Sequence, residues 1–226
     1  MANEGASNDA APKRALVIAV DGPAASGKGT IARALARHFG LPHMDTGLLY
    51  RAAALNLWRW GGDPGNEFEA VRAARELGVD PDDPELRSEP VSKIASSISA
   101  YPGVREALLE RQQDFARQPG GAVLDGRDIG TVIAPNADVK LFVTATPEAR
   151  AKRRMGELEQ RGMRARYDDV LADIHARDER DSSREVAPLR QARDAILLDN
   201  TDLDVDQAIN ESLCLVEARL AKSKRR

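Results

Sequence analysis

The sequence predicts an α/β fold in which helices flank a parallel β-sheet. Two observations carry this prediction. Short apolar runs, typical of strands that are covered on both faces, alternate with longer segments of helical periodicity. A glycine-rich turn joins the first apolar run to an amphipathic helix, as in the strand–loop–helix units of parallel sheets. The predicted strands are residues 15–20, 121–126, 139–145 and 195–200.

The predicted helices follow from apolar residues at helical spacing and from the residues that end each run. In the first helix Ile31, Leu35 and Phe39 recur on one face, and Gly40 ends it. The segment 78–90 is rich in proline and acidic residues, which predicts a loop. The other predicted helices cover residues 48–60, 67–77, 91–98, 104–115, 147–160, 168–180 and 205–220.

The composition is that of an ordinary folded protein. Of 226 residues, 42% are hydrophobic and 31% are charged, and the length suits one α/β domain with an inserted subdomain. The net charge of −3 argues against a general nucleic-acid binder, which carries a basic surplus. The single cysteine, Cys214, excludes an intramolecular disulfide and a multi-cysteine metal site, and we expect it to pack in the core.

Membrane and secretory classes are disfavoured by the distribution of apolar residues. Residues 1–14 contain acidic side chains and lack an apolar core, so they are interpreted as a disordered tail rather than a signal peptide. No apolar run approaches the length of a membrane span. We therefore expect a cytoplasmic protein that binds neither a membrane nor nucleic acid.

The glycine-rich turn has the spacing of a phosphate-binding loop, in which four residues separate Gly22 from Gly27 and Lys28 follows directly. Glycines let successive backbone N–H groups turn inward around a phosphate, and the helix N-terminus and the lysine add positive charge. The alternative, a turn that binds nothing, is disfavoured by the strand before the motif and the amphipathic helix after it. The predicted ATP-binding residues are Gly22, Pro23, Ala24, Ala25, Ser26, Gly27, Lys28, Gly29 and Thr30.

Gly29 occupies the position after the lysine, where the usual pattern has Ser or Thr. The hydroxyl is moved by one residue to Thr30, which is our candidate for contact with Mg²⁺, directly or through a water molecule. The Gly-Lys-Gly-Thr variant resembles the nucleoside monophosphate kinases rather than the GTPases and transport ATPases.

Arginines and aspartates gather in three further segments, residues 44–51, 125–130 and 177–184. Each segment alone is most simply read as a set of surface ion pairs, which are common and contribute little. Beside a phosphate loop the interpretation changes, because two phosphorylated substrates bring more negative charge than one lysine and Mg²⁺ neutralise. Arginine suits this task because its planar fork bonds phosphate oxygens in pairs.

These segments together resemble the bacterial cytidylate kinases, and the matching residues run in family order from Gly22 to Leu189. The combination of DGRDIGTV with RDxRDxxR is far more specific than the phosphate loop alone. The matching motifs are GPAASGKGT, DTGLLYR, YPGVREALLERQ, DGRDIGTVI, AKRRM and RDERDSSREVAPL.

The resemblance implies a P-loop NTPase-type sheet with NMP-binding and short lid insertions. It implies transfer of the terminal phosphoryl group of ATP to CMP or dCMP, with Mg²⁺ as the cofactor of ATP. The catalytic residues it implies are Lys28, Arg127, Arg153 and Arg184, with Arg154, Arg161, Arg164 and Arg166 as weaker lid candidates. The implied substrate-binding residues are Thr46, Tyr50, Arg51, Ser96, Arg105, Arg127, Asp128, Arg177, Asp181 and Arg184.

Each of these substrate-binding residues is assigned a part of CMP by the same resemblance. The phosphate is assigned to Arg51, Arg127 and Arg184. The cytosine is assigned to Ser96, Arg105 and Asp128, and the sugar to Tyr50, Arg177 and Asp181.

The resemblance also divides the chain. Residues 1–14 form the tail and 15–226 a single kinase domain, which we expect to be a monomer. Typical family members carry a longer, hairpin-like insertion where this chain has only residues 77–90, so we expect the small extra sheet to be incomplete. The core is assigned to residues 15–45, 103–152 and 168–222, the NMP-binding region to 46–102 and the lid to 153–167.

Two other readings remain open at this point. The first is a kinase of the same fold that acts on UMP, AMP or a small acid such as shikimate, since the phosphate loop does not discriminate among acceptors. The second is a nucleotide-dependent switch, although the N/TKxD motif that reads guanine is absent from the sequence. The chain also lacks a recognisable Ser-His-Asp or Cys-His set. Transfer to an already ionised phosphate needs no general base, so this lack agrees with the kinase reading.

Overall fold

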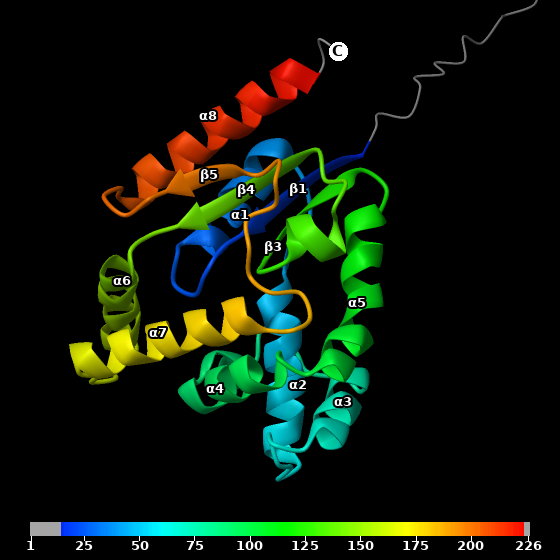
Figure 1. Cartoon of the computed structure of the whole chain (residues 1–226), viewed down its shortest axis with the longest axis vertical. Coiled ribbons are helices and arrows are strands. Elements are labelled where there is room, and N and C mark those ends of the chain that lie inside the picture. Colours follow the sequence, from blue (N-terminus) through cyan, green and yellow to red (C-terminus); the bar gives the residue numbers. More distant parts are fainter. Residues whose placement is uncertain (1–14, 224–226) are drawn as a thin grey trace, which may run out of the picture.

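The structure is a computed structural model that describes residues 15–223, and it is built on a five-stranded parallel sheet (Figure 1). The strand order is β2-β3-β1-β4-β5, and every neighbouring pair is parallel. The predicted tail, residues 1–14, lies outside the described residues. The strands are β1 (Leu16–Asp21), β2 (His43–Asp45), β3 (Gly121–Gly126), β4 (Val139–Thr144) and β5 (Ile196–Asp199).

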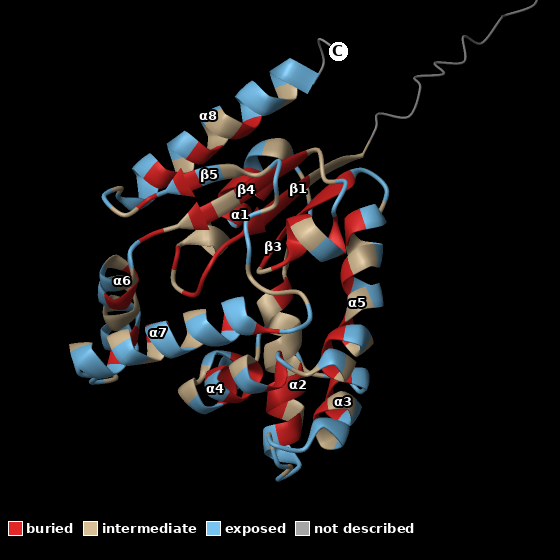
Figure 2. Ribbon diagram, in the orientation of Figure 1, coloured by how far each residue is buried: buried red, intermediate tan, exposed pale blue. Residues whose placement is uncertain are grey.

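Helices connect the strands and cover both faces of the sheet. The side chains of β1, β3 and β4 are almost wholly buried, as expected for parallel strands between two helical layers (Figure 2). The longer helices are α1 (Lys28–Phe39), α2 (Thr46–Arg59), α3 (Glu67–Arg75), α4 (Glu89–Ile98), α5 (Pro102–Arg117), α6 (Pro147–Gln160), α7 (Tyr167–Ser183) and α8 (Val205–Ser223). Two short helical segments are η1 (Pro84–Arg87) and η2 (Ile129–Ile133).

Two apolar clusters hold the helices to the sheet. On one face Ile31 and Leu35 of α1 and Val216 of α8 pack against β1, β3 and β4. On the other face Ala116 of α5 and Ile129 of η2 pack against β1 and β3. The result is a three-layered α/β/α body.

A second, purely helical core lies beyond one end of the sheet, where Figure 1 shows α2, α3 and α4 beside the first half of α5. Leu55, Leu57, Ile98 and Leu108 are fully or almost fully buried in this cluster. A further small cluster joins α6 and α7 to the phosphate loop through Ala24. Three packed units therefore converge on the loop that follows β1.

Most of the predicted elements are present within a few residues of the expected ends, but three observed elements, β2, η1 and η2, were not predicted. β2 has only three residues, too few to produce an apolar run in the sequence. η2 is a single π-helical turn. Residues 78–88 form a loop and η1, and no strand lies between β2 and β3 in the described chain.

The expectation for Cys214 was wrong, because its side chain is exposed. The face of α8 that meets the sheet is set by Ala208, Ser212 and Val216, and Cys214 lies off that face. Among residues 15–223, no helix is both long enough and apolar enough to cross a membrane.

Candidate active site

The carboxyl ends of three neighbouring strands meet at one edge of the sheet. In the sheet register Asp21 of β1 lies beside Gly126 of β3, and Asp45 of β2 lies beside Asp125 of β3. The phosphate loop follows β1 and the DGRD segment follows β3, so two motifs a hundred positions apart in the sequence become neighbours. Ligands of open α/β sheets bind at this kind of edge.

The phosphate loop has the backbone that its glycines predict. A Cβ atom on Gly22 would lie 2.0 Å from the carbonyl oxygen of Val143, so only glycine lets the loop pass β4 this closely. Gly27 has φ = +84°, a left-handed conformation that favours glycine, and it is the N-cap residue of α1. The free N–H groups at the start of α1 therefore lie at the loop.

Two side chains that the sequence analysis missed support the loop from behind. Nδ2 of Asn200, just after β5, donates to the carbonyl of Ser26 at 2.9 Å. Nη1 of Arg150 on α6 donates to the carbonyl of Ala24 at 3.2 Å, and Asp178 of α7 holds the same guanidinium. Both support residues are buried, so neither is visible as a motif in the sequence.

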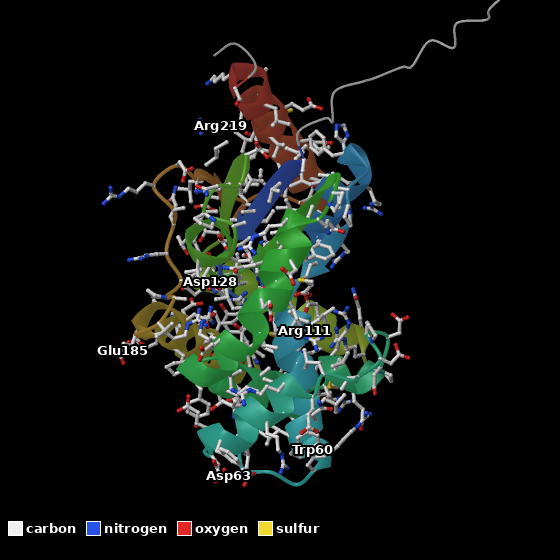
Figure 3. The ribbon with its side chains drawn as sticks, turned by 90° about the vertical axis from the view of Figure 1, so that its right-hand side faces the viewer. Trp60, Asp63, Arg111, Asp128, Glu185 and Arg219 are labelled. Carbon is white, nitrogen blue, oxygen red and sulfur yellow. The ribbon has the colours of Figure 1, made fainter. Side chains whose placement is uncertain are left out.

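A cavity of about 300 Å³ opens in front of the loop. It is lined by every predicted ATP-binding and substrate-binding residue except Gly22 and Pro23, which form the back of the loop. Figure 3 labels one lining residue, Asp128, between the sheet and the helical core, far from Trp60 and Asp63 at the tip of that core. Basic side chains in the lining outnumber acidic ones, which suits anionic ligands.

Lys28 lies at the centre of the lining, and its Nζ donates to the carbonyl of Pro23 at 3.3 Å. Burial first, and repulsion from Arg127 second, lower the pKa of Lys28 to about 8. The carboxylates of Asp125 and Asp45 act in the opposite direction. A nearby phosphate would favour the charged lysine in the same way.

Arg127 and Arg184 share the carboxylate of Asp181. Nε of Arg127 donates to Asp181 Oδ2 at 2.7 Å, while Nη2 of Arg184 lies 3.9 Å from the other oxygen. The pKa of Asp181 lies below its usual value, because attraction to these guanidiniums outweighs burial. Nη2 of Arg184 is buried without a hydrogen-bond partner in residues 15–223, so it is available to an acceptor from outside the chain.

Arg177 is a second buried guanidinium with unused donors. Its Nε is ion-paired with Oδ2 of Asp173 on the same helix at 2.9 Å, whereas its Nη2 is buried without a hydrogen-bond partner within the described chain. Burial lowers the pKa of Arg177, and the nearby Arg154 and Arg127 lower it further. Buried donors of this kind indicate a site for an anion.

Arg105, Asp128 and Tyr50 form one wall of the cavity. Arg105 pairs with Asp128 and stacks over the ring of Tyr50 at 5.7 Å from its centroid. Arg105 and Asp128 are both buried, and the pair presents a donor and an acceptor side by side. Ser96 lies on the neighbouring wall, where its hydroxyl accepts from Arg180 at 3.3 Å.

Arg51 and Thr46 come from the start of α2. Nη1 of Arg51 donates to Ser92 Oγ at 2.5 Å and to the carbonyl of Leu86 at 3.1 Å, and burial lowers the pKa of Arg51 to about 10. Thr46 donates its hydroxyl to the carbonyl of Asp125 at 2.8 Å, so its role in the structure is to tie α2 to β3.

Comparison with known proteins decides the family. A model of the family described as "Cytidylate kinase" matches residues 18–218. A cytidylate kinase of Xanthobacter autotrophicus is 58% identical over 91% of this chain and 99% of its own length. One from Methylocella silvestris is 56% identical over 90% of this chain and 94% of its own length.

The chain belongs to the cytidylate kinase family.

The fold is also found in more distant proteins. The crystal structure of shikimate kinase from Bacteroides thetaiotaomicron matches 89% of this chain and 98% of its own, with a TM-score of 0.50 and 14% identity. Identity this low relates the two proteins by fold alone. This chain therefore shares its parallel sheet flanked by helices with a shikimate kinase, which agrees with the predicted fold class.

Two arginines of α6 differ from the prediction in whether they line the cavity. Arg153 was predicted to be catalytic, but it lies outside the cavity lining, and its two Nη atoms donate to Oδ1 and the carbonyl oxygen of Asn200 at 2.9 and 2.6 Å. Arg154 lies in the lining instead, paired with Glu89 of α4 and Glu157 of α6. Sequence spacing alone does not show which of two adjacent arginines faces the cavity.

The oxygen donors near the loop fit a magnesium ion carried by a nucleotide. In residues 15–223 no group of three or more acidic, histidine or cysteine side chains is arranged to hold a metal by itself. Asp125 lies 3.6 Å from the position that a Cβ on Gly29 would occupy, close to where the usual Ser or Thr hydroxyl would be. One or two such oxygens, completed by phosphates and water, are what Mg²⁺ requires.

Asp125 was not among the predicted site residues, although it stands in the DGRD motif. Its Oδ1 lies 2.8 Å from Nε2 of His43 on β2. The histidine holds the carboxylate from the side away from α1, so Asp125 has a defined orientation beside the loop.

Proposed function

We propose that this protein transfers the terminal phosphoryl group of ATP to CMP or dCMP, giving ADP and CDP or dCDP. The observation that carries the proposal is the cavity itself, in which a phosphate loop faces buried guanidiniums with unused donors. Such a cavity suits two phosphorylated molecules placed head to head. The names of the relatives at more than half identity supply the base, cytosine.

The phosphate loop would hold ATP. The N–H groups around Gly27 and at the start of α1 would surround the β- and γ-phosphates, and Lys28 would add a full charge. Thr30 and Asp125 would hold Mg²⁺, directly or through water. When bound with ATP, Mg²⁺ offsets the charge of the phosphate oxygens.

The guanidiniums of the opposite wall would hold the acceptor. Arg51, Arg127 and Arg184 line the cavity and would bind the CMP phosphate. Arg177 and Asp181 would contact the sugar. The pair of Arg105 and Asp128, together with Ser96 and Tyr50, would contact the cytosine, whose edge carries both donors and acceptors.

The reaction requires positioning more than proton transfer. A phosphate oxygen of CMP attacks the γ-phosphorus of ATP, a new O–P bond forms, and the bond to the β–γ bridging oxygen breaks in line with it. The acceptor phosphate has a second pKa of about 6 and is largely ionised at neutral pH, so no general base is needed. Lys28, Arg127 and Arg184 would stabilise the charge on the transferring group, with Arg154 as the candidate from α6 in place of Arg153.

The two regions around the cavity would move as ATP and CMP bind. The NMP-binding region, residues 46–102, and the lid, residues 153–167, would close over both substrates and exclude the water that would otherwise take the phosphoryl group. We further propose a cytoplasmic monomer.

The test is a panel of acceptors with the purified full chain, ATP and Mg²⁺. CMP, dCMP, UMP, AMP and shikimate are each added, and ADP release is followed by a coupled assay. We expect CMP and dCMP to be the best acceptors. Faster turnover of UMP, AMP or shikimate would assign the protein a different acceptor, and ATP binding without turnover of any acceptor would favour a switch.

Lys28→Met tests the assignment of the phosphate loop in the same assay. The unbranched methionine side chain fills similar space without charge, so we expect folding by circular dichroism to be retained while kcat falls about a hundredfold or more. Near-normal turnover by this variant would contradict the assignment of the loop.

A further inference from the structure

Asp21, the last residue of β1, is a buried carboxylate that the proposed reaction does not use. It is 4% exposed and lies outside the residues that line the cavity. Burial raises the pKa of Asp21 to about 6, partly offset by backbone hydrogen bonds, so keeping it ionised at neutral pH costs stability. The buried, ionised Asp21 carboxylate therefore lowers stability, and its hydrogen bonds indicate the role that it has in the structure.

Both oxygens of Asp21 accept backbone N–H groups from the start of η2. Oδ1 accepts from Ile129 and Oδ2 from Gly130, each at 2.8 Å. The first N–H groups of a helix have no partner within that helix. Asp21 therefore caps η2 from a position 108 residues earlier in the chain than Ile129.

The residue at the N-cap position of η2 is Asp128, and an aspartate there ordinarily accepts an N–H group of the second or third helical residue, here Gly130 or Thr131. In the described chain the side chain of Asp128 makes no such cap hydrogen bond. Its carboxylate pairs with Arg105 at the wall of the cavity instead. One aspartate thus caps the helix while the other faces the ligand.

We propose that Asp21 is a positioning residue that caps η2 in place of Asp128 and so leaves the Asp128 carboxylate to hold Arg105 for the acceptor base. This inference rests on the proposed function, in which the pair of Arg105 and Asp128 contacts the cytosine. Without Asp21, the free N–H group of Gly130 would draw the Asp128 carboxylate away from Arg105. The negative charge of Asp21 repels that of Asp128. Loss of the charge alone would therefore not weaken the ion pair.

The first test is Asp21→Asn, which keeps the size of the side chain but replaces one acceptor by an N–H₂ donor. We expect the KM for CMP to rise about fivefold or more, a change of the size expected for the loss of a helix cap. The KM for ATP should stay within about twofold. In an Asp128→Ala background, Asp21→Asn should cause no further rise in the KM for CMP. Equal rises in the two KM values, or additive effects of the two substitutions, would overturn the proposal.

Gly130→Ala provides a second test that keeps the carboxylate. The added Cβ would lie 3.3 Å from Asp21 Oδ2 and 3.0 Å from the side chain of Lys140, so it presses on the same contact. We expect a smaller rise in the KM for CMP, and no change would count against the proposal. The matched control is Asp138→Asn, because Asp138 Oδ2 accepts from the N–H of Val17 at 2.9 Å near the start of β1, and there we expect unaltered KM values.

Amide hydrogen exchange separates this proposal from the proposed function. The amides of Ile129 and Gly130 are measured by NMR in the substrate-free protein, and we expect them to exchange faster in Asp21→Asn than in the wild type. Unchanged exchange would overturn the cap. A wild-type protein that does not phosphorylate CMP would refute the proposed function, while faster exchange in the variant would still support the cap.

Discussion

The charged side chains of the cavity differ in whether the protein already neutralises them. Arg127 is bonded to Asp181 at 2.7 Å, so its charge is balanced before a ligand arrives. Lys28 has only the Pro23 carbonyl as a hydrogen-bond partner within residues 15–223. Its pKa of about 8 reflects burial first and repulsion from Arg127 second. The charge of Lys28 is therefore available to pair with a phosphate of ATP.

This property predicts proton uptake on ATP binding. Below pH 7 Lys28 is already protonated in the free protein, so binding takes up no proton there. At pH 9 most of the free protein has a neutral Lys28, and the bound triphosphate favours the charged form, so uptake approaches one proton. Affinity for ATP should correspondingly decline above pH 8.

Calorimetry in buffers of different ionisation enthalpy measures this uptake. ATP contributes little of its own at pH 9, where its phosphates are fully ionised. In Lys28→Met the rise in uptake between pH 7 and pH 9 should disappear. A flat proton uptake in the wild type over this range would show that Lys28 does not titrate there.

Elements on both sides of the loop determine its shape. The glycines permit the turn, but the carbonyls of Ala24 and Ser26 are held by Arg150 from α6 and by Asn200 from the end of β5. Arg153 in turn holds Asn200 through both of its Nη atoms. The predicted lid arginine therefore acts, in the substrate-free structure, on the back of the ATP site.

Asn200→Ala should raise the KM for ATP more than the KM for CMP. The substitution removes the bond to Ser26 and leaves Arg153 without its side-chain acceptor, a loss of about 1–3 kcal/mol of stability. The control is Asn56→Ala, since Asn56 also donates to backbone carbonyls, those of Ala73 and Glu76, within the helical core. Thermal unfolding with both KM values measures the difference. A KM for ATP that is unchanged in Asn200→Ala would remove the support role.

The helical core and the unit formed by α6 and α7 touch across the cavity through few polar contacts. α4 of the helical core meets α6 through the pair of Glu89 and Arg154 and meets α7 through Ser96 and Arg180. Arg161, after α6, also donates to the carbonyl of Arg87 at 3.0 Å. Half-exposed contacts of this kind contribute little energy, so they permit the units to separate.

Glu89→Gln should loosen the contact between the helical core and α6. Because a partly exposed ion pair contributes at most about 1 kcal/mol, the separated population should rise by up to about fivefold. Trypsin cleavage in the arginine-rich loop at residues 161–166 measures this population in the substrate-free protein. Glu157→Gln is the matched control, since it removes the other partner of Arg154 but lies on the same helix. Equal cleavage rates in Glu89→Gln and the wild type would exclude the pair as a link between the units.

The local signals in the sequence determined the class of the fold, the phosphate loop and most of the residues around the cavity. Apolar runs, glycine spacing and motif order depend on residues that are near one another in the chain, so they are legible without coordinates. The three-residue strand β2 produced too short a pattern to be seen. Cys214 was misplaced because two residues of a helix span about 200°, which puts it on the side of α8 opposite the buried Val216.

Only the tertiary structure decided which of these residues line the cavity and which support it from behind. It turned Arg153 to the back of the loop and Arg154 into the cavity, and it gave the cap of η2 to Asp21 so that Asp128 meets Arg105. These arrangements depend on distances between segments that are far apart in the sequence. Those distances determine which acceptor lies within hydrogen-bond reach of each buried donor. A sequence specifies the groups that need partners, whereas only the packed chain determines the partner that each one finds.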